Sequence, residues 1–262
     1  MQYTLASSLC SALPAIQRPI ILITCTRCHS FFASCSDGDR IMNVLLFGAT
    51  GMVGDGVLDE CLKDSRVDSV LAVTRSALDV SHRKLRELRR KDFFDYRDIA
   101  REFESVDACF FCLGVSSVGM KEEDYYHLTY DLTLSAASAL ATARPNATFC
   151  YVSGEGTDSS ERGRSMWARV KGKTENAILA LPLRAYMFRP GFIRPRPGAR
   201  SKTRWYRVMY AILTPLYPLL YRLAPGHVTT SEAMGRSMIA VAVNGYEKRV
   251  LQNSDINEVG KE

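Results

Sequence analysis

The chain has 262 residues, a length that suits one large domain or one domain with a small appendage. Its hydrophobic content of 47% and charged content of 24% are those of an ordinary globular protein, without repeats or long low-complexity tracts. The net charge of +6 is compatible with phosphate-bearing ligands or an anionic membrane but identifies neither. We expect no nucleic-acid partner and no metal site. The eight cysteines do not form a disulfide framework, which indicates a reducing compartment.

The first segment, residues 1–41, differs from the rest of the chain. It is rich in Ser and Cys and carries Arg18, Arg27 and Arg40. Its apolar run at 19–24 is too short to span a bilayer, and no secretory cleavage pattern follows a charged start. The segment is therefore either a disordered or non-native extension or an organelle-targeting presequence. The first alternative predicts a cytoplasmic protein, and the second an organelle protein.

Within this segment, Cys25, Cys28 and His29 match the C-x-x-C-H pattern of covalent haem attachment. A haem site also needs a distal ligand and an apolar pocket, and the segment offers neither. We therefore expect no haem.

From Asn43 onward, short apolar runs alternate with amphipathic stretches. The runs are typical of strands that are buried on both faces of a parallel sheet. The expected strands are Asn43–Phe47, Ser69–Thr74, Val106–Leu113, Thr148–Val152, Ala185–Phe188 and a short last strand at Lys248–Leu251. The expected helices are Met52–Leu62, Tyr125–Thr142 and Ser165–Leu181. A fourth helix is expected to begin at a capping box at Thr229–Glu232, to run through Val243 and to end at Asn244-Gly245.

This alternation predicts right-handed βαβ crossovers, and so an α/β fold with a doubly wound parallel sheet of the Rossmann type. Residues 42–195 are expected to form the Rossmann domain. Residues 196–262 are expected to complete the same domain as a small, mostly helical region on the substrate side.

The loop between the first strand and the first helix carries glycines at a phosphate-binding spacing, in Gly48-Ala49-Thr50-Gly51-Met52-Val53-Gly54. Gly48 permits a tight turn, Gly51 lets backbone approach a phosphate, and Gly54 lets the helix pack on the sheet. The helix N-terminus then presents N–H groups and a positive dipole end to the anion. The predicted pyrophosphate site is formed by Gly48, Thr50, Gly51, Met52, Val53 and Gly54.

The end of the second strand is expected to contact the adenosine ribose. An acidic residue there would favour NAD, but this strand is followed by Arg75 and Ser76. A guanidinium suits a 2′-phosphate. The sequence therefore predicts NADP(H) in preference to NAD.

The glycine loop resembles the G-x-x-G-x-x-G loop of atypical and extended short-chain dehydrogenase/reductases. Over residues 42 to about 255, the chain is most similar to NAD(P)-binding proteins of the sugar-epimerase-like and TIP30/CC3-like type. The resemblance implies that Ser153 is the family's catalytic serine and that Lys171 is the lysine of the Tyr-x-x-x-Lys motif. It also implies further cofactor contacts by Lys171, by Asp92 and Phe93, by Leu113 and Gly114, and by Pro190, Gly191, Phe192 and Ile193.

The chain departs from the family pattern at Trp167, which stands four residues before Lys171, where the family has its tyrosine. An indole N–H donates a hydrogen bond but cannot act as a general acid or base. Tyr130, on the helix after the fourth strand, is a candidate replacement for the proton transfer. Without a replacement, the chain would bind the cofactor as a sensor or interaction protein without turnover.

Residues 200–223 form a basic run followed by an apolar and aromatic stretch that contains two prolines and internal arginines. We expect this segment either to roof the substrate pocket or to lie on a membrane surface, and the two roles are compatible. His227, just before the last long helix, is expected to be structural.

The expected activity is that of an oxidoreductase or epimerase on an unidentified small carbonyl or alcohol substrate. The non-catalytic binding protein is the alternative, and the sequence leaves the oligomeric state open.

Overall fold

The computed structural model describes residues 41–196, 222 and 224–261. The chain divides into two compact units, residues 1–36 and 37–262, and the first of them lies outside the described residues. The expectations for the segment 1–41 and for most of 200–223 therefore fall outside the described residues.

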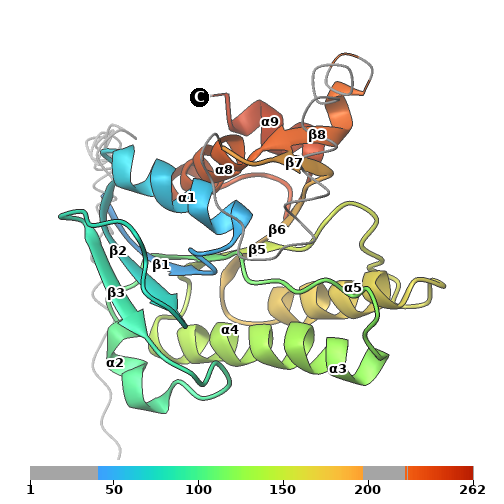
Figure 1. Ribbon diagram of the computed structural model, residues 1–262, viewed down its shortest axis with the longest axis horizontal. Helices are drawn as coiled ribbons and strands as arrows, with labels where there is room; N and C mark the ends of the chain where they lie inside the picture. The colour runs from blue at the N-terminus through green and yellow to red at the C-terminus, as the bar shows by residue number, and fades with distance from the viewer. Residues whose placement is uncertain (1–40, 197–221, 223, 262) are drawn as a thin grey trace, which may run out of the picture. The chain divides into compact units, whose positions relative to one another are not determined.

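A parallel sheet of seven strands forms the centre of the second unit (Figure 1). The strands lie in the order β3-β2-β1-β4-β5-β6-β9, so the chain reverses its direction of winding between β1 and β4. This order confirms the predicted doubly wound fold, and such a reversal is where α/β sheets bind ligands. The strands are β1 (Met42–Phe47), β2 (Val67–Thr74), β3 (Leu85–Arg89), β4 (Ala108–Phe111), β5 (Thr148–Val152), β6 (Arg184–Arg189) and β9 (Val250–Gln252).

Helices cover both faces of the sheet (Figure 1). One face carries α1 (Met52–Lys63), α8 (Ser231–Asn244) and α9 (Asn253–Val259). The opposite face carries α2 (Ala100–Phe103), α3 (Glu122–Tyr126), α4 (Leu132–Ala143) and α5 (Met166–Leu179). The single-turn helices are η1 (Arg97–Ile99) and η4 (Pro225–His227), and a π-helical turn, η2 (His127–Asp131), joins α3 to α4.

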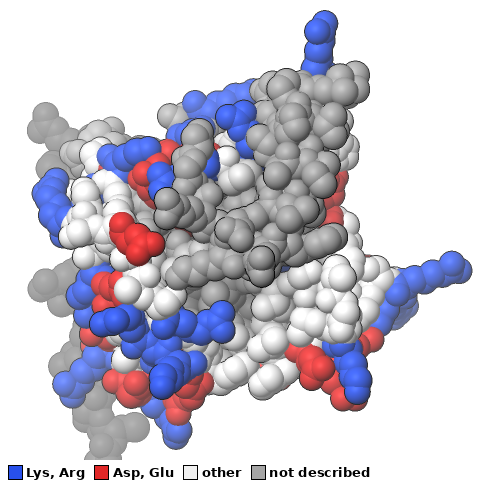
Figure 2. Space-filling model, viewed as in Figure 1, with Lys and Arg blue, Asp and Glu red and all other residues white. Residues whose placement is uncertain are grey.

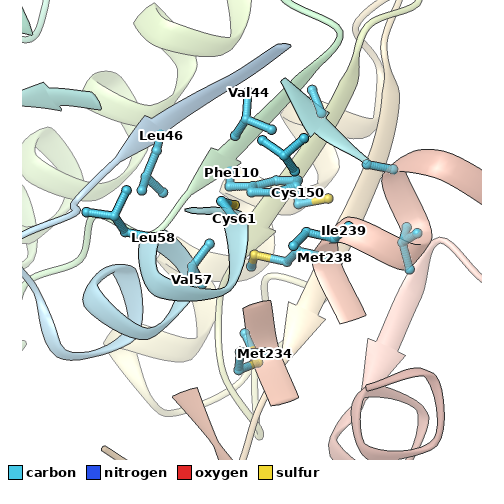
Figure 3. Close-up of a cluster of buried hydrophobic side chains, with 14 of the residues drawn as sticks. Val44, Leu46, Val57, Leu58, Cys61, Phe110, Cys150, Met234, Met238 and Ile239 are labelled. Atoms are coloured by element: carbon cyan, nitrogen blue, oxygen red, sulfur yellow. The ribbon is translucent and has the colours of Figure 1, made fainter. Parts of the chain in front are cut away.

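Alternate side chains of the strands supply two hydrophobic cores, one on each face of the sheet. On the first face, strand side chains such as Val44 and Phe110 point toward Val57 of α1 and toward Met234 and Met238 of α8 (Figure 3). On the second face, the buried residues include Phe47, Phe103, Phe111, Phe149 and Leu140. The near-continuous apolar runs in the sequence are therefore explained by burial on both sides.

Cys61, Cys109 and Cys150 are buried free thiols, and Cys112 is a partly buried one. They lie in helix or strand or at a strand end, as expected for small apolar residues. Burial raises the pKa of the Cys61 and Cys109 thiols well above their ordinary value, so they stay protonated.

Several elements were not expected from the sequence. β3 carries three charged residues, Arg86, Glu87 and Arg89, because it is an edge strand with no fully buried side chain. β7 (Phe192–Arg194) and β8 (Val228–Thr230) form a separate two-stranded parallel sheet whose strands are too short to give a periodic pattern. Helix α9 begins with a capping box that is formed by Gln252 and Asp255.

The predicted capping box at Thr229–Glu232 is wrong. The N-cap of α8 is Thr230, whose hydroxyl oxygen accepts the N–H of Ala233 at 3.0 Å. Thr229 belongs to β8, and the Glu232 carboxylate accepts from the hydroxyl of Ser231. The N-cap lies one residue later than predicted because strand β8 continues through Thr230. The predicted end is confirmed, since Gly245 caps the helix with a φ of +75°.

Charged side chains of both signs are mixed over the surface formed by β3 and α2 (Figure 2). Arg86 pairs with Glu102, and Arg97 pairs with Asp95 at 2.5 Å. Such exposed pairs contribute little to stability, and this region is an ordinary solvated surface.

A prediction follows from the crossing of α1 and α8. A Cβ on Gly56 would lie 2.4 Å from the Cβ of Ser231 and 2.8 Å from its main-chain carbon, so the close approach of the two helices leaves no room for a side chain here. Gly56→Ala should lower the free energy of unfolding by up to about 2 kcal/mol, because an overpacking cost near the upper end of the usual range of about 1–3 kcal/mol outweighs a helix-propensity gain of about 1 kcal/mol.

The measurement is chemical denaturation of the parent and variant. Gly226→Ala is the control, since a Cβ at Gly226 meets no atom within 4 Å. A Gly56→Ala protein as stable as the parent would contradict the prediction.

Candidate functional site

The glycine loop is a turn whose shape the surrounding backbone dictates. Gly48 has a φ of +82°, and a Cβ there would lie 2.7 Å from the carbonyl carbon of Cys112. A Cβ on Gly54 would lie 2.1 Å from the carbonyl oxygen of Gly48. The N–H of Gly51 closes the turn by donating to the same oxygen at 2.8 Å. Positions 48 and 54 therefore exclude any side chain unless the main chain moves.

Helix α1 begins directly from this turn without a side-chain cap. Its N-cap is Gly51, and its first hydrogen bond outside the turn runs from the N–H of Asp55 to the Gly51 carbonyl at 2.8 Å. N–H groups at the start of a helix require partners from outside the helix, and an anion satisfies them. Thr50, Met52 and Val53, the other predicted phosphate contacts, all lie in this segment.

The segment after β4 runs beside the glycine turn. The N–H of Cys112 donates to the carbonyl of Phe47 at 3.0 Å, and a Cβ on Gly48 would come within 2.9 Å of the Leu113 nitrogen. Gly114 is exposed, and a Cβ there meets nothing within 4 Å. The structure therefore brings the predicted Leu113-Gly114 contact to the glycine loop.

The carboxyl end of β2 carries an exposed cation. Arg75 makes no side-chain hydrogen bond or ion pair with any residue that the structure describes. Beside it, Thr74 is buried, and its hydroxyl has no hydrogen-bond partner in the described part of the chain. A buried polar atom without a partner is uncommon in a folded protein. This edge of the sheet therefore offers an arginine and a hydroxyl to a polar ligand.

The two predicted adenine contacts have different environments. Asp92 is exposed, and its carboxylate accepts the N–H of Phe94 at 2.8 Å. Phe93 is buried, with its ring edge-on to Phe47 at a centroid distance of 6.4 Å. The Phe93 side chain is part of the core, so only Asp92 offers a side chain at the surface.

At the end of β5, Ser153 is part of a buried polar network. Its hydroxyl donates to the Glu175 carboxylate at 2.5 Å, and the Phe188 carbonyl lies 3.1 Å away. Glu175 is 1% exposed and forms a two-pronged ion pair with Arg189, in which Nε lies 3.0 Å from Oε1. The predicted catalytic serine thus has its hydroxyl engaged with a buried carboxylate.

Lys171 lies one helical turn before Glu175 and donates from its ammonium group to the main-chain carbonyl of Ser153. Burial lowers the pKa of Lys171 to about 8, and the nearby Glu175 carboxylate opposes part of that shift. The structure therefore brings Ser153 and Lys171 together as predicted. The Lys171 ammonium contacts the main-chain oxygen of Ser153 rather than its hydroxyl.

Trp167 is partly buried on the first turn of α5. Its ring packs against the turn after β5, where a Cβ on Gly156 would lie 3.4 Å from the indole. Its N–H has no hydrogen bond to any described residue. The tryptophan therefore fills space beside the site and keeps an available donor.

Tyr130 is not brought to Ser153 and Lys171. It stacks on Tyr126 with a centroid distance of 4.7 Å, and the ammonium of Lys173 lies 5.0 Å and 5.5 Å from the two rings. Burial is the main cause that raises the pKa of Tyr130 above its ordinary value, so the phenol stays protonated. The geometry gives no support to a proton-transfer role for Tyr130.

The turn after β6 is held from two sides. The Pro190 carbonyl accepts the N–H of Glu155 at 2.8 Å, and the N–H of Gly191 donates to Asn253 at 2.9 Å. A Cβ on Gly191 would lie 2.2 Å from the His227 carbonyl. Phe192 and Ile193 continue from this turn into β7. Sequence reasoning did not assign Glu155 or Asn253 to the site, although the Gly-Glu-Gly run around Glu155 marks an unusual turn.

Two further observations concern membrane-spanning helices and metal sites. None of the helices in the described residues has the length and apolar character to cross a membrane. The described residues also contain no group of His, Cys, Asp or Glu side chains that could hold a metal ion. The haem-like pattern at Cys25 and the segment 200–221 lie outside the described residues.

Comparison with known proteins identifies a family over part of the chain. Residues 44–161 match the NAD dependent epimerase/dehydratase family. Two fungal proteins are similar over longer spans. Protein fmp52, mitochondrial, from Emericella nidulans is 24% identical over 237 residues, which cover 84% of this chain and 99% of that protein. Protein FMP52-2, mitochondrial, from Scheffersomyces stipitis is 28% identical over 162 residues, which cover 61% and 68% of the two chains.

Solved structures share the fold. The Bordetella bronchiseptica enzyme WbmF, in complex with NAD+, superposes with a TM-score of 0.59 and 16% identity over 85% of this chain and 78% of its own. A short chain dehydrogenase from Burkholderia cenocepacia, in complex with NADP, gives a TM-score of 0.57 and 12% identity over 85% and 92% of the two chains. The family match supports the resemblance deduced from the glycine loop over residues 44–161, and the solved structures confirm the Rossmann fold.

The buried ion pair under the site generates a prediction. Arg189→Met leaves the Glu175 carboxylate without its cation and should lower the free energy of unfolding by about 3–5 kcal/mol. The double variant Arg189→Met, Glu175→Met replaces the pair with apolar groups of similar length and should recover most of that loss.

Denaturation of the parent, both single variants and the double variant closes the cycle. Additive losses in the double variant would show that the two side chains do not interact.

Proposed function

We propose that this chain is an NADP(H)-dependent oxidoreductase or epimerase that acts on a small carbonyl or alcohol substrate. The observation that supports this most strongly is the glycine turn between β1 and α1. The close contacts of Gly48 and Gly54 leave no room for a side chain, and α1 has no side-chain cap. Main-chain N–H groups remain for an anion, which suits the pyrophosphate of a dinucleotide.

The other residues along this edge fit the remaining parts of a nicotinamide dinucleotide. The unpartnered hydroxyl of Thr74 and the exposed Arg75 stand where the adenosine ribose is expected. An arginine without a carboxylate partner suits a 2′-phosphate rather than a 2′-hydroxyl. The exposed Asp92 would contact the adenine. These features support NADP(H) over NAD. Relatives with either cofactor are known: the WbmF structure contains NAD+, and the Burkholderia structure contains NADP.

At the nicotinamide end, Lys171 is the group that would bind the ribose hydroxyls. Its ammonium is held against the Ser153 carbonyl and is already partly desolvated, so a polar ligand that replaces the lost water would be favoured. Pro190, Gly191, Phe192 and Ile193 would form the wall of that pocket. The bound cofactor supplies or accepts a hydride, and the protein must supply or accept the accompanying proton.

A second function is favoured by one observation, the presence of Trp167 in place of a tyrosine. An indole does not exchange a proton in the useful pH range. If no other group takes over the proton transfer, the chain binds NADP(H) without turnover.

The names of two relatives bear on the compartment. Both fungal proteins named above are called mitochondrial. We therefore propose that residues 1–41 act as a mitochondrial presequence. The expected cytoplasmic location has no support. Peripheral membrane contact through 200–223 stays a proposal, and salt-sensitive flotation with anionic liposomes would support it.

The cofactor preference can be tested at Arg75. Arg75→Asp removes the cation and adds a repelling charge beside the 2′-phosphate. It should weaken NADPH binding by about 10- to 100-fold, because hydrogen bonds to charged groups contribute about 1.5–3 kcal/mol. NADH binding should change little. Fluorescence titration of both cofactors gives the two dissociation constants.

Arg83→Asp is the matched control, since Arg83 is also exposed and unpartnered among the described residues but precedes β3, at the amino edge of the sheet. Equal weakening of NADPH binding in both variants would indicate a general charge effect and not a 2′-phosphate site.

The choice between the two functions can be tested at Trp167. The parent protein should oxidise NADPH in the presence of an aldehyde and diketone panel, and Trp167→Phe should keep most of that rate because the indole transfers no proton. If the chain is a binding protein, only Trp167→Tyr should show turnover, with a gain of about 100-fold or more from the restored acid. The measurement is NADPH absorbance with each variant saturated with cofactor.

A further inference from the structure

We propose that Glu155 and His227 form an acid–base dyad that exchanges the substrate's proton, in the role that Trp167 cannot fill. This inference rests on the proposed function. His227 would be the catalytic residue, and Glu155 its positioning residue. The two side chains meet across 72 positions of sequence, with His227 Nδ1 2.5 Å from Glu155 Oε1.

The place of the pair is the first part of the argument. A Cβ added to Gly191 would lie 2.2 Å from the His227 carbonyl and 2.6 Å from Glu155 Oε2. Both members therefore lie directly against the Pro190-Gly191 turn, which is the predicted wall of the nicotinamide pocket. Glu155 also lies only two residues after Ser153, whose carbonyl binds the Lys171 ammonium. The dyad and the lysine thus stand at the same end of the sheet.

The backbone on the Glu155 side is built to hold this carboxylate. Gly154 has a φ of +136° and Gly156 a φ of +83°, conformations that side chains of L residues rarely allow. Between them, the N–H of Glu155 donates to the Pro190 carbonyl at 2.8 Å. A glutamate on an ordinary surface loop needs none of these constraints.

The backbone on the His227 side is anchored as firmly. The buried amide of Asn253 donates to the Val228 carbonyl at 3.0 Å while its oxygen accepts the Gly191 N–H at 2.9 Å. Asn257 donates to the same Val228 carbonyl at 2.7 Å. One side chain therefore ties the residue after His227 to the turn itself, and the imidazole is held by its contact with Glu155.

The chemistry follows from the hydrogen bond between the two side chains. A carboxylate only accepts, so Nδ1 of His227 carries a hydrogen and donates it to Glu155. Nε2 is then the nitrogen that can exchange a proton with a substrate. The His227 side chain is 66% exposed and the Glu155 side chain 42%, so the imidazole has access both to a ligand and to water.

In the direction of reduction, the substrate carbonyl gains a hydride at carbon and a proton at oxygen. A reduced nicotinamide dinucleotide, if bound at the glycine turn, would supply a hydride from its ring C–H bond to form the substrate's new C–H bond, and the π electrons of the carbonyl would move to oxygen. That oxygen takes the proton from Nε2 of the protonated imidazole, whose N–H bond breaks. The neutral imidazole then recovers a proton from water. Oxidation of an alcohol runs through the same steps in reverse.

The chain contains a matched control pair. His127 and Asp131 form a second histidine–carboxylate pair, with 2.9 Å between Nδ1 and Oδ2 and side-chain exposures of 58% and 43%. This pair lies within one helical segment, η2, and its imidazole stacks on Phe94. It has the same chemistry and similar exposure, but it is on the outer helical layer and not at the Pro190-Gly191 turn.

The first experiment needs no substrate. The full-length protein is treated with diethyl pyrocarbonate with and without saturating NADP+, and acylation of each histidine is followed by mass spectrometry. NADP+ should slow the modification of His227 and leave that of His127 unchanged. Equal modification of His227 in both samples would overturn the inference.

The second experiment measures proton transfer with diacetyl as the carbonyl probe. His227→Gln should bind NADPH like the parent but reduce diacetyl about 100-fold or more slowly, and His127→Gln should behave like the parent in both assays. His227→Ala should regain activity with added imidazole. Glu155→Gln should lose activity, whereas Glu155→Asp should keep part of it. Thermal unfolding confirms that each variant is folded.

The outcomes separate the two proposals. If the parent does not bind NADPH, the proposed function and the dyad both fail. If the parent binds NADPH while His227 is unprotected and His227→Gln turns over normally, only the dyad fails, and the pair is a structural link between the β5 loop and β8.

Discussion

The close approach of the β1–α1 turn to the end of β4 is the constraint on which the site depends. Three main-chain segments meet there: the turn at Gly48, the start of α1 at Gly54, and the chain leaving β4 at Cys112. No side chain separates them, so strand β1 can end, turn and enter a helix without leaving the sheet edge. The reversal of strand order between β1 and β4 makes room beside that turn. The proposed anion site is therefore a consequence of backbone packing and needs few side chains of its own.

A second layer of the structure supports the opposite end of the same edge. The buried Glu175–Arg189 pair links α5 to β6 and, through the Ser153 hydroxyl, to β5. Lys171, one turn earlier on α5, is held by the Ser153 carbonyl. The Ser153 hydroxyl bonds to the Glu175 carboxylate, which is paired with Arg189, and the Ser153 carbonyl stays available to Lys171. The lysine is therefore positioned without a tyrosine beside it. Trp167 thus supplies no titratable proton donor at this place, while the contacts that hold Lys171 and Ser153 do not depend on it.

The sequence was sufficient for features that depend on local pattern. Apolar runs identified the central strands because they are buried on both faces, and the glycine spacing identified the tight turn between β1 and α1. It was insufficient where partners are distant. Glu175 and Arg189 resemble surface charges in a helical pattern, and only the fold shows that they are buried together. The edge strand β3 escaped notice because an edge position allows charged residues within it. Tyr130 was placed near the catalytic centre by helix position alone, whereas the π-helical turn η2 stacks it on Tyr126.

The packing of the main chain explains why a proton donor can be replaced more easily than the backbone cradle, that is, the three segments that meet at Gly48, Gly54 and Cys112. The cradle requires three backbone segments in van der Waals contact, so a change in any of them displaces the others. A proton donor requires one titratable group within reach of the substrate oxygen and a route to water. The turn at Pro190-Gly191 is approached by two loops, one after β5 and one before β8, and either can bring a side chain to it. The family's tyrosine approaches from α5, and this chain offers a carboxylate and an imidazole from the two loops instead.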